Sequence, residues 1–354
     1  MMKTRIRAAG IAGLAALAVT TLTIADAQER EAPVVDIKPG RIILLGADRA
    51  GERIVAVGER GIAMLSDDQG QSWRFVTTPT TRTLTGVAFV DDKTGVAVGH
   101  GASLVRTVDG GETWTKQVLE EAGIESLLGV TEIAGGRLLV YGAFGLYFVS
   151  DDGGESWRKK TVMYDDFDRH ISQIVEVGDK LLMVAESGIL ARSDDRGETW
   201  IKLDSPYEGS FFGATAAGDG SVLAYGMRGN VYRSENFASA ELIFPEVEEP
   251  DVEAEDYDEY AIVEPEGATG VIWQKIPLDT TTSLMAGLLL SDGRILLVGN
   301  SGLLAESEDN GRDLHLHFAP ELGDMSQVLE VDGKLISVGL YGIRPIEHEM
   351  LASQ

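Results

Sequence analysis

The chain has 354 residues, a net charge of −27 at pH 7 and no cysteine. The lack of cysteine excludes disulfides, a thiolate nucleophile, cysteine-based zinc sites and a lipoprotein anchor. The negative charge argues against nucleic acid and against anionic membrane surfaces as partners. The 42 glycines favour turn-rich β structure.

The first 27 residues have the features of a secretory signal peptide. Met1–Arg7 is basic, residues 8–24 are apolar, and Ala25 and Ala27 are small residues at the positions that signal peptidase reads. The sequence therefore predicts a signal peptide over residues 1–27, cleavage after Ala27, and export, to the periplasm in a Gram-negative cell. The alternative is an uncleaved membrane anchor. No later segment is long and apolar enough to insert into a bilayer.

An eight-residue motif of the form Ser/Thr-x-Asp-x-Gly-x-Ser/Thr-Trp recurs along the rest of the chain. Its clean copies comprise Ser66, Asp68, Gly70 and Trp73; Thr107, Asp109, Gly111 and Trp114; Ser150, Asp152, Gly154 and Trp157; and Ser193, Asp195, Gly197 and Trp200. A worn copy runs from Ser307 to Leu314. The tryptophans recur at steps of 41, 43 and 43 residues, which indicates a repeat architecture.

The residues of this motif suit a tight turn. Glycine allows a positive φ, Ser/Thr and Asp bond to the turn backbone, and tryptophan buries a large ring between neighbouring repeats. We therefore assign the motif, called the box below, to structure and expect no catalytic residue in it.

Each repeat reads as a meander of four short strands. A glycine after the second strand occurs once in each repeat and so gives their number. These glycines are Gly61, Gly101, Gly145, Gly188, Gly229, Gly302 and Gly342. One such unit cannot bury both of its faces, so the units stack around an axis. The sequence predicts an all-β, seven-bladed β-propeller of four-stranded antiparallel blades over residues 28–354.

The seventh repeat reaches the end of the sequence without a box, so its outer strand must come from elsewhere. Pro33, Pro39 and Gly46 have the spacing of Trp73, Pro79 and Gly86. We expect Pro33–Lys38 to form the outer strand of the last blade and to close the ring, which removes exposed sheet edges.

The fifth repeat is interrupted by an insert. Ser234 to Asn236 begin a box whose tryptophan is Trp273, so residues 237–270 form the insert. Residues 246–266 contain eleven acidic and no basic residues, a composition typical of disorder. A solubilising loop and a docking segment for a basic partner are both open. The anchors of such a segment would be Tyr257, Tyr260, Ile262 and Val263.

The topology separates two rims of the ring. The boxes lie on one, here called the box rim, together with the insert, which we expect to be separable from the other rim. Loops between blades and turns between second and third strands form the other, here called the turn rim. Arginine and aromatic side chains dominate the energetics of protein interfaces. The candidate partner-binding residues on the turn rim are Arg60, Arg82, Phe144, Tyr164, Arg169, Tyr207, Phe211, Phe212 and Arg228.

The box is the Asp-box, or BNR repeat, of sialidases, related glycosidases and many non-enzymatic propellers. With the repeat Leu84–Val90, Gly95–Gly99 and the box that follows, the chain most resembles the photosystem II assembly and stability factors of cyanobacteria and chloroplasts and their relatives in non-photosynthetic bacteria. Together with the signal peptide, the resemblance implies an exported, non-catalytic scaffold, and we expect a monomer without a cofactor. The resemblance also implies an arginine-rich patch facing an unassembled membrane protein subunit. Relatives outside photosynthesis often accompany resistance-nodulation-division exporters, which makes a membrane transport complex another implied partner.

A sialidase-like glycoside hydrolase, or a glycan-binding propeller, is the alternative. A sialidase needs an arginine cluster for a carboxylate, a tyrosine nucleophile with a glutamate, and an acid/base aspartate. The residues that could supply these groups are Arg41, Arg60, Arg82, Arg169 and Arg228, with Tyr164 and Asp165 or Asp168. The Arg-Ile-Pro signature of sialidases is missing near the first blade. His100 and His170 could bind a metal, although scattered histidines are more often plain surface residues, and we expect no metal.

Overall fold

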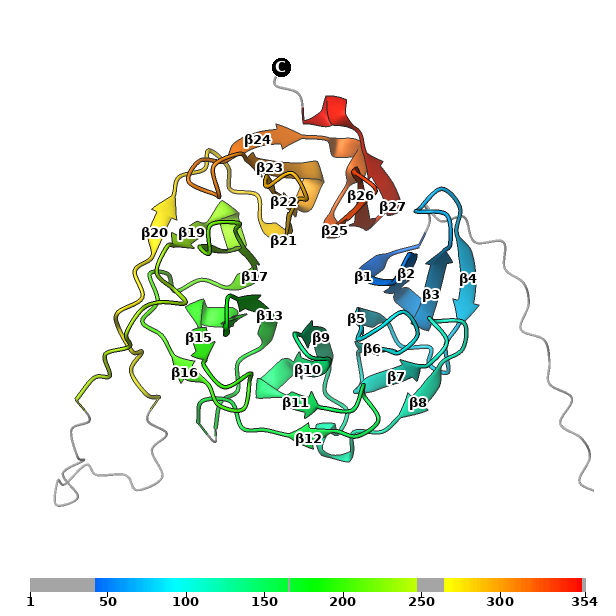
Figure 1. Cartoon of the computed structure of the whole chain (residues 1–354), viewed down its shortest axis with the longest axis horizontal. Helices are drawn as coiled ribbons and strands as arrows, with labels where there is room; N and C mark the ends of the chain where they lie inside the picture. Colours follow the sequence, from blue (N-terminus) through cyan, green and yellow to red (C-terminus); the bar gives the residue numbers. More distant parts are fainter. Residues whose placement is uncertain (1–41, 165, 247–263, 352–354) are drawn as a thin grey trace, which may run out of the picture. The chain divides into compact units, whose positions relative to one another are not determined.

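The computed structural model describes residues 42–164, 166–246 and 264–351. The chain divides into two units, residues 1–36 and 37–354, and every described residue lies in the second. Within these ranges, seven antiparallel sheets are arranged around a common axis (Figure 1). The only helices there are single 3-10 turns, and none has the length and apolar character needed to cross a bilayer.

Six sheets have four strands each, in chain order from the axis outward. Blade one comprises β1 (Leu44–Ala50), β2 (Arg53–Gly58), β3 (Ile62–Ser66) and β4 (Arg74–Thr77). Blade two comprises β5 (Leu84–Phe89), β6 (Gly95–Gly99), β7 (Ser103–Thr107) and β8 (Thr115–Gln117). Blade three comprises β9 (Leu127–Ile133), β10 (Arg137–Gly142), β11 (Tyr147–Ser150) and β12 (Arg158–Lys159). Blades four to six comprise β13 (Ile171–Val177), β14 (Lys180–Ala185), β15 (Leu190–Ser193), β16 (Ile201–Lys202); β17 (Phe211–Ala216), β18 (Val222–Gly226), β19 (Val231–Ser234), β20 (Gln274–Ile276); and β21 (Leu284–Leu289), β22 (Ile295–Gly299), β23 (Leu303–Ser307), β24 (His315–Phe318).

Blade seven has three described strands, β25 (Met325–Val331), β26 (Lys334–Gly339) and β27 (Gly342–Ile346). The 3-10 turns are η2 (Glu59–Gly61), η3 (Glu120–Ala122), η4 (Ala143–Gly145), η5 (Glu186–Gly188), η6 (Met227–Gly229), η7 (Asn300–Gly302), η8 (Pro320–Leu322) and η9 (His348–Met350). The predicted seven-bladed propeller of four-stranded blades is confirmed. The predicted closing strand Pro33–Lys38 lies outside the described residues and stays a prediction.

The strands form where the repeat places apolar runs. The second strands are buried along most of their length, and β6 along all of it, because they are packed between two neighbouring blades. The inner strand β13 is buried at Ile171, Ile174 and Val177 and only partly buried between them. The outer strand β8 is short and polar because its edge faces solvent.

The hydrophobic core is divided into clusters that lie between neighbouring blades. Trp114 of blade two packs with Val55 and Leu65 of blade one. Trp200 of blade four packs with Leu139 of blade three, and Leu314, the worn copy's substitute for tryptophan, lies in the cluster that includes residues of blade five. The box therefore fastens each outer strand to the blade before it.

Blades seven and one meet through side chains that bond to backbone. The Gln327 amide accepts from the Ala47 N–H and donates to the Ala47 carbonyl, both at 2.8 Å. Ser326 Oγ donates to the Leu44 carbonyl at 3.0 Å. Trp73 of blade one packs with Leu329 of blade seven. These contacts join the first and last described blades, whose inner strands β1 and β25 are neighbours in Figure 1.

The interrupted box of blade five is completed across the insert. Asn236 Oδ1 accepts from the Ile272 N–H at 2.9 Å, and Asn236 Nδ2 donates to the Gly270 carbonyl at 2.8 Å. Ile272 precedes Trp273 as Ser72 precedes Trp73, and the Ser72 N–H is bound by Asp68 in the same way. An asparagine therefore takes the role that aspartate has in the other boxes.

Candidate functional site

The boxes use their polar side chains on themselves. Ser150 Oγ donates to Asp152 Oδ1 at 2.7 Å and accepts from the Gly154 N–H at 2.9 Å, while Asp152 Oδ1 accepts from the Ser156 N–H at 2.9 Å. Partial burial opposes ionisation, but the hydrogen bonds from Ser156, Ser150 and the backbone lower the pKa of Asp152 to about 2. The carboxylates of the boxes are therefore occupied by their own turns.

Five arginines fasten one blade to the box of the next. Each arginine donates to the backbone carbonyl at the fourth position of the box, directly before the glycine. In the split box of blade five, this fourth position is the residue after Asn236. The pairs are Arg53 with Gly110 (3.0 Å), Arg106 with Gly153 (2.8 Å), Arg137 with Arg196 (3.0 Å), Arg192 with Phe237 (3.1 Å) and Arg233 with Asn310 (2.7 Å). Our sequence reasoning missed this set, although three of these arginines directly precede the first box residue.

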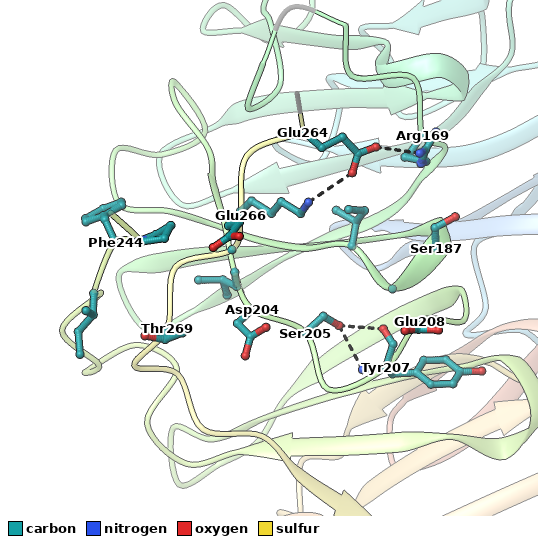
Figure 2. A pocket seen from close by; sticks show the side chains of 17 residues that line it. Arg169, Ser187, Asp204, Ser205, Tyr207, Glu208, Phe244, Glu264, Glu266 and Thr269 are labelled. Carbon is teal, nitrogen blue, oxygen red and sulfur yellow. Dashed lines mark hydrogen bonds and ion pairs between the residues drawn. The ribbon is translucent and has the colours of Figure 1, made fainter. Parts of the chain in front are cut away.

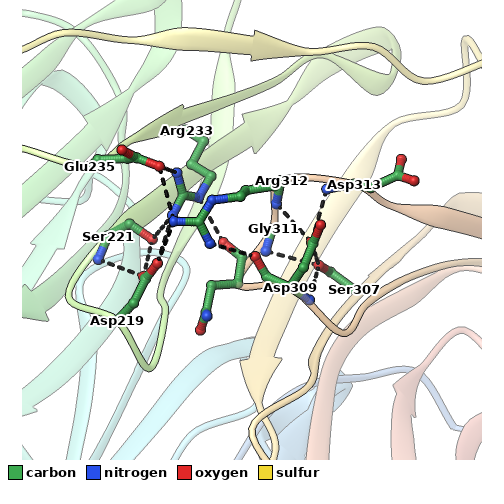
Figure 3. Close-up of polar contacts among 10 residues, drawn as sticks. Asp219, Ser221, Arg233, Glu235, Ser307, Asp309, Gly311, Arg312 and Asp313 are labelled. Carbon is green, nitrogen blue, oxygen red and sulfur yellow. Dashed lines mark hydrogen bonds and ion pairs between the residues drawn. The ribbon is translucent and has the colours of Figure 1, made fainter.

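The most buried of these arginines belongs to a four-membered ionic network (Figure 3). Arg233 is 2% exposed and pairs with Asp219 at 2.9 Å and with Glu235. Arg312 of blade six contacts the same two carboxylates, each at 3.1 Å. Burial raises the pKa of Asp219, but bonds from Ser221 and the charges of the two arginines lower it overall. The charges at this part of the box rim thus neutralise one another.

The turn rim has a fixed backbone and variable side chains. Arg60, Phe144 and Arg228 have φ values of 59°, 52° and 58°, in the left-handed region that side chains rarely adopt. A glycine follows each, and a Cβ on Gly61 would lie 2.0 Å from the Thr80 carbonyl oxygen. The glycine is therefore required for the backbone path, whereas the residue before it is exposed and free to vary.

A hollow of about 430 Å³ crosses this rim over blades two to five, and we call it the rim hollow. Its lining residues are His100, Glu125, Ser126, Leu128, Ala143, Phe144, His170, Ser172, Glu186, Ser210 and Phe212. The His170 ring lies against Phe144, with centroids 5.0 Å apart, and its Nδ1 lies 2.9 Å from Glu186 Oε2. Burial raises the pKa of Glu186, but the backbone N–H and ring of His170 lower it below its ordinary value.

A second hollow, of about 560 Å³, lies between blade four and the ends of the insert (Figure 2), and we call it the stem hollow. Glu264 pairs with Arg169 at 2.8 Å and with Lys202 at 3.4 Å across it. The turn η5 separates the two hollows, since Glu186 lines the rim hollow while Ser187 and the following glycine line the stem hollow.

The position of Glu264 corrects the prediction that the insert lies only on the box rim. Ala268 pairs in parallel with Leu203 at the outer edge of blade four, with its N–H donating to the Lys202 carbonyl at 2.8 Å. This pairing carries the insert across the blade, so its end reaches Arg169 on the turn rim. Residues 247–263, with the four anchors proposed from sequence, lie outside the described residues.

The structure distributes the predicted partner-binding residues over different surroundings. Phe144 and Phe212 line the rim hollow, and Arg169 and Tyr207 line the stem hollow. The side chains of Arg60, Arg82 and Arg228 are exposed, and Tyr164 is partly buried.

Phe211 does not belong to the accessible surface. It is fully buried, edge-on to Tyr207 and Tyr232 with centroids 5.5 and 6.0 Å away. It begins the inner strand of its blade, and this position is buried and apolar throughout the ring. The equivalents are Leu44, Leu84, Leu127, Ile171, Leu284 and Met325. That repeated apolar position was the sequence signal that distinguished Phe211 from Phe212.

The groups considered for glycoside hydrolysis come together only in part. Burial and the nearby Glu264 charge raise the pKa of Tyr164, whereas a nucleophilic tyrosine needs a more accessible phenolate. Arg169 pairs with Asp168 and Glu264. Arg60, Arg82 and Arg228 belong to blades one, two and five, and Arg41 and Asp165 lie outside the described residues. No group of three His, Asp or Glu is placed to hold a metal ion in the part of the chain that the structure describes.

These features define a class: an Asp-box propeller whose box carboxylates bind their own turns and whose turn rim carries variable, exposed side chains. The sequence profile described as photosynthesis system II assembly factor YCF48 matches residues 65–241, half of the chain. The chain belongs to this family. It matches none of the curated protein sequences with which it was compared.

Solved structures with the same fold include members of that family. The structure described as YCF48 bound to D1 peptide has a TM-score of 0.61 and 15% identity, and the match covers 88% of this chain and 95% of that one. YCF48 from Cyanidioschyzon merolae has a TM-score of 0.64 and 13% identity, covering 87% and 95%. The WD40 β-propeller domain of Doa1 gives 0.62 and 11%, covering 89% and 97%.

Proposed function

We propose that this protein is an exported, non-catalytic scaffold that holds a segment of a membrane-complex subunit on its turn rim. The observation that carries the proposal is the rim hollow, because it is open and is lined by side chains from four successive blades. On the box rim, by contrast, the arginines and carboxylates of the described ionic network bind one another and the backbone.

Family membership and one solved relative support this proposal. The family is described as an assembly factor, and one relative is described as bound to the D1 peptide. The basic and apolar N-terminus supports export, because it has the form of a signal peptide. The partner is then a subunit of a membrane complex, and a membrane exporter is the version that the bacterial relatives suggest.

Crosslinking and co-purification from membranes of the source cell test this function. Phe144→Ala combined with Arg228→Glu should reduce recovery of the membrane subunit by at least tenfold, since both side chains are exposed on the turn rim. Phe318→Ala is the matched control, because Phe318 and Phe144 are both 56% exposed and Phe318 lies on an outer strand. Equal recovery with both variants would refute a turn-rim scaffold, and turnover of a sialoside would refute the non-catalytic assignment.

A further inference from the structure

The rim hollow has the form of a site for an extended chain. Its walls come from the turn of blade two at His100, the loop leading to β9, the turn η4, and the first residues of β13 and β17. This surface crosses four blades and is open to solvent, so it offers successive contacts to a partner longer than a single side chain. An extended peptide, which advances about 3.3 Å per residue, can contact the four blades in succession.

Phe144 gives this surface an apolar platform that the fold does not need. Its side chain is 56% exposed and its backbone is held at φ 52°. A bulky residue is strained in this region, and blades four and six place serines, Ser187 and Ser301, at the same point of the turn. Burial in the core does not explain a phenylalanine here, so contact with a ligand is the better explanation.

The charged groups of the rim hollow are acidic. Glu125 and Glu186 line it, and no lysine or arginine does. The backbone N–H of His170 donates to Glu186 Oε1 at 2.9 Å and holds this carboxylate in place. A cation above Phe144 would meet the negative face of an aromatic ring as well as the carboxylates.

We propose that the rim hollow binds an extended peptide segment in which a lysine or arginine lies beside an apolar side chain. The apolar group packs against Phe144, Phe212 and Leu128, and the cation lies near Glu125 and Glu186. This inference rests on the proposed scaffold function and names the chemistry of the segment that is held. The arginines Arg60, Arg82 and Arg228 are on the same rim but outside this lining, so an acidic segment would have to bind elsewhere.

Fluorescence polarisation with labelled nine-residue peptides tests the inference on the full exported chain. Three probes differ only in their central residues, Lys-Leu-Arg, Lys-Ser-Arg and Glu-Leu-Glu, within the same Gly/Ser flanks. The Lys-Leu-Arg peptide should bind at least tenfold more tightly than either of the others at 150 mM salt. Phe144→Ala, and separately the pair Glu125→Gln and Glu186→Gln, should each weaken it roughly tenfold.

Matched controls separate this site from general attraction to an acidic protein. Phe318→Ala removes an equally exposed ring, and Glu155→Gln with Glu121→Gln removes two exposed charges that do not line the rim hollow. Neither should change the affinity by more than twofold, and all variants should keep the melting temperature of the parent protein. Tighter binding of the Glu-Leu-Glu peptide, or equal losses in the control and rim variants, would overturn the inference.

The scaffold function and the peptide chemistry fail in different ways. If Phe144→Ala abolishes capture of the membrane subunit but the Lys-Leu-Arg peptide shows no preference, the scaffold stands and the peptide class is wrong. If the peptide binds as expected and capture is unaffected, the rim hollow has the proposed chemistry and the scaffold function is wrong.

Discussion

The two rims of the propeller are built from the same repeats but obey different constraints. On the box rim, the side chains themselves form the turn, so Ser or Thr, Asp and Gly must recur, as in Ser150, Asp152 and Gly154. On the turn rim, only the glycine is required, and the residue before it changes from Arg60 to Phe144 to Ser187. Stability is therefore concentrated where the repeats agree, and the positions where they differ form the surface on which we propose recognition.

Removal of a buried box tryptophan should give the largest loss of stability. Trp200 is 5% exposed and packs edge-on to Tyr147, with centroids 5.9 Å apart. Trp200→Ala should lower the free energy of unfolding by about 3–5 kcal/mol, as large-to-small core changes do. The partly buried Trp157 should lose less on the same change. Urea unfolding followed by circular dichroism gives both values, and a loss of peptide binding in folded Trp200→Ala protein would contradict the division between the rims.

The next largest loss of stability should follow from removing Arg233, the buried arginine of the ionic network. Arg233→Ala leaves Asp219 and Glu235 facing each other and frees the Asn310 carbonyl, so we expect a loss of about 2 kcal/mol. Arg312 contacts the same carboxylates, but its side chain is half exposed and solvent screens its charge, so Arg312→Ala should lower the stability less than Arg233→Ala does. Thermal unfolding of both variants measures the difference. Equal losses would mean that burial does not set the strength of this network.

Asp48, on the inner strand β1, should make the free energy of unfolding depend on pH. Burial and the Glu132 charge raise its pKa to about 6, against hydrogen bonds such as that from the Phe89 N–H at 2.8 Å. Because the folded state binds the proton more tightly, the parent protein loses stability as pH rises from about 4 to 6.

Asp48→Asn removes this loss, since the amide oxygen still accepts from Phe89. It should stabilise the protein by about 3 kcal/mol at pH 7 and by nearly nothing at pH 4. Melting curves across this range check the sign. Asp67→Asn is the control, since the bonds from Arg53 and Arg74 lower the pKa of Asp67, and its destabilising effect should instead fade as pH decreases.

The split box makes a smaller and counterintuitive prediction. Asn236→Asp restores the usual box residue, yet it should destabilise blade five by about 1 kcal/mol. Asn236 Nδ2 donates to the Gly270 carbonyl, and a carboxylate there would face that oxygen without a proton. In the box of blade three, Asp152 Oδ2 accepts a hydrogen bond from Ser156 Oγ. Ile272 occupies the position of Ser156 in blade five and has no hydroxyl to donate. Increased stability on this change would contradict the described bonding.

The smallest change in stability should come from shortening the central part of the insert while keeping its two described ends, here called the stems. Replacing residues 247–263 with a short Gly/Ser linker should change the free energy of unfolding by less than about 0.5 kcal/mol, because loop length contributes weakly. Deleting residues 240–268 should cost more, since it removes the Ala268–Leu203 pairing and the Glu264 bridge. Hydrogen exchange at Leu203 distinguishes the two deletions, and identical protection in both would mean that the stems contribute nothing to blade four.

The repeat motif alone was enough to predict the blades. The box is made by bonds within eight residues, and its recurrence in a 41–43-residue period indicates the stacking before any coordinates are known. Sequence reasoning also separated the two rims, because the order of strands in a meander decides which turns share an edge. It misplaced Phe211, although the apolar residue that recurs at the start of every inner strand marks this position as buried.

The sequence by itself determined the fold class, the seven repeats, the boxes and the interruption at residue 237, because these depend on local bonds and on a period. Only the tertiary structure decided which arginine fastens which box, how Asn236 reaches Ile272, and that Glu264 meets Arg169. It also decided that residues from four blades form the rim hollow. The physical reason is that these partners are separated by tens of residues, and their meeting depends on the packing of whole blades against one another.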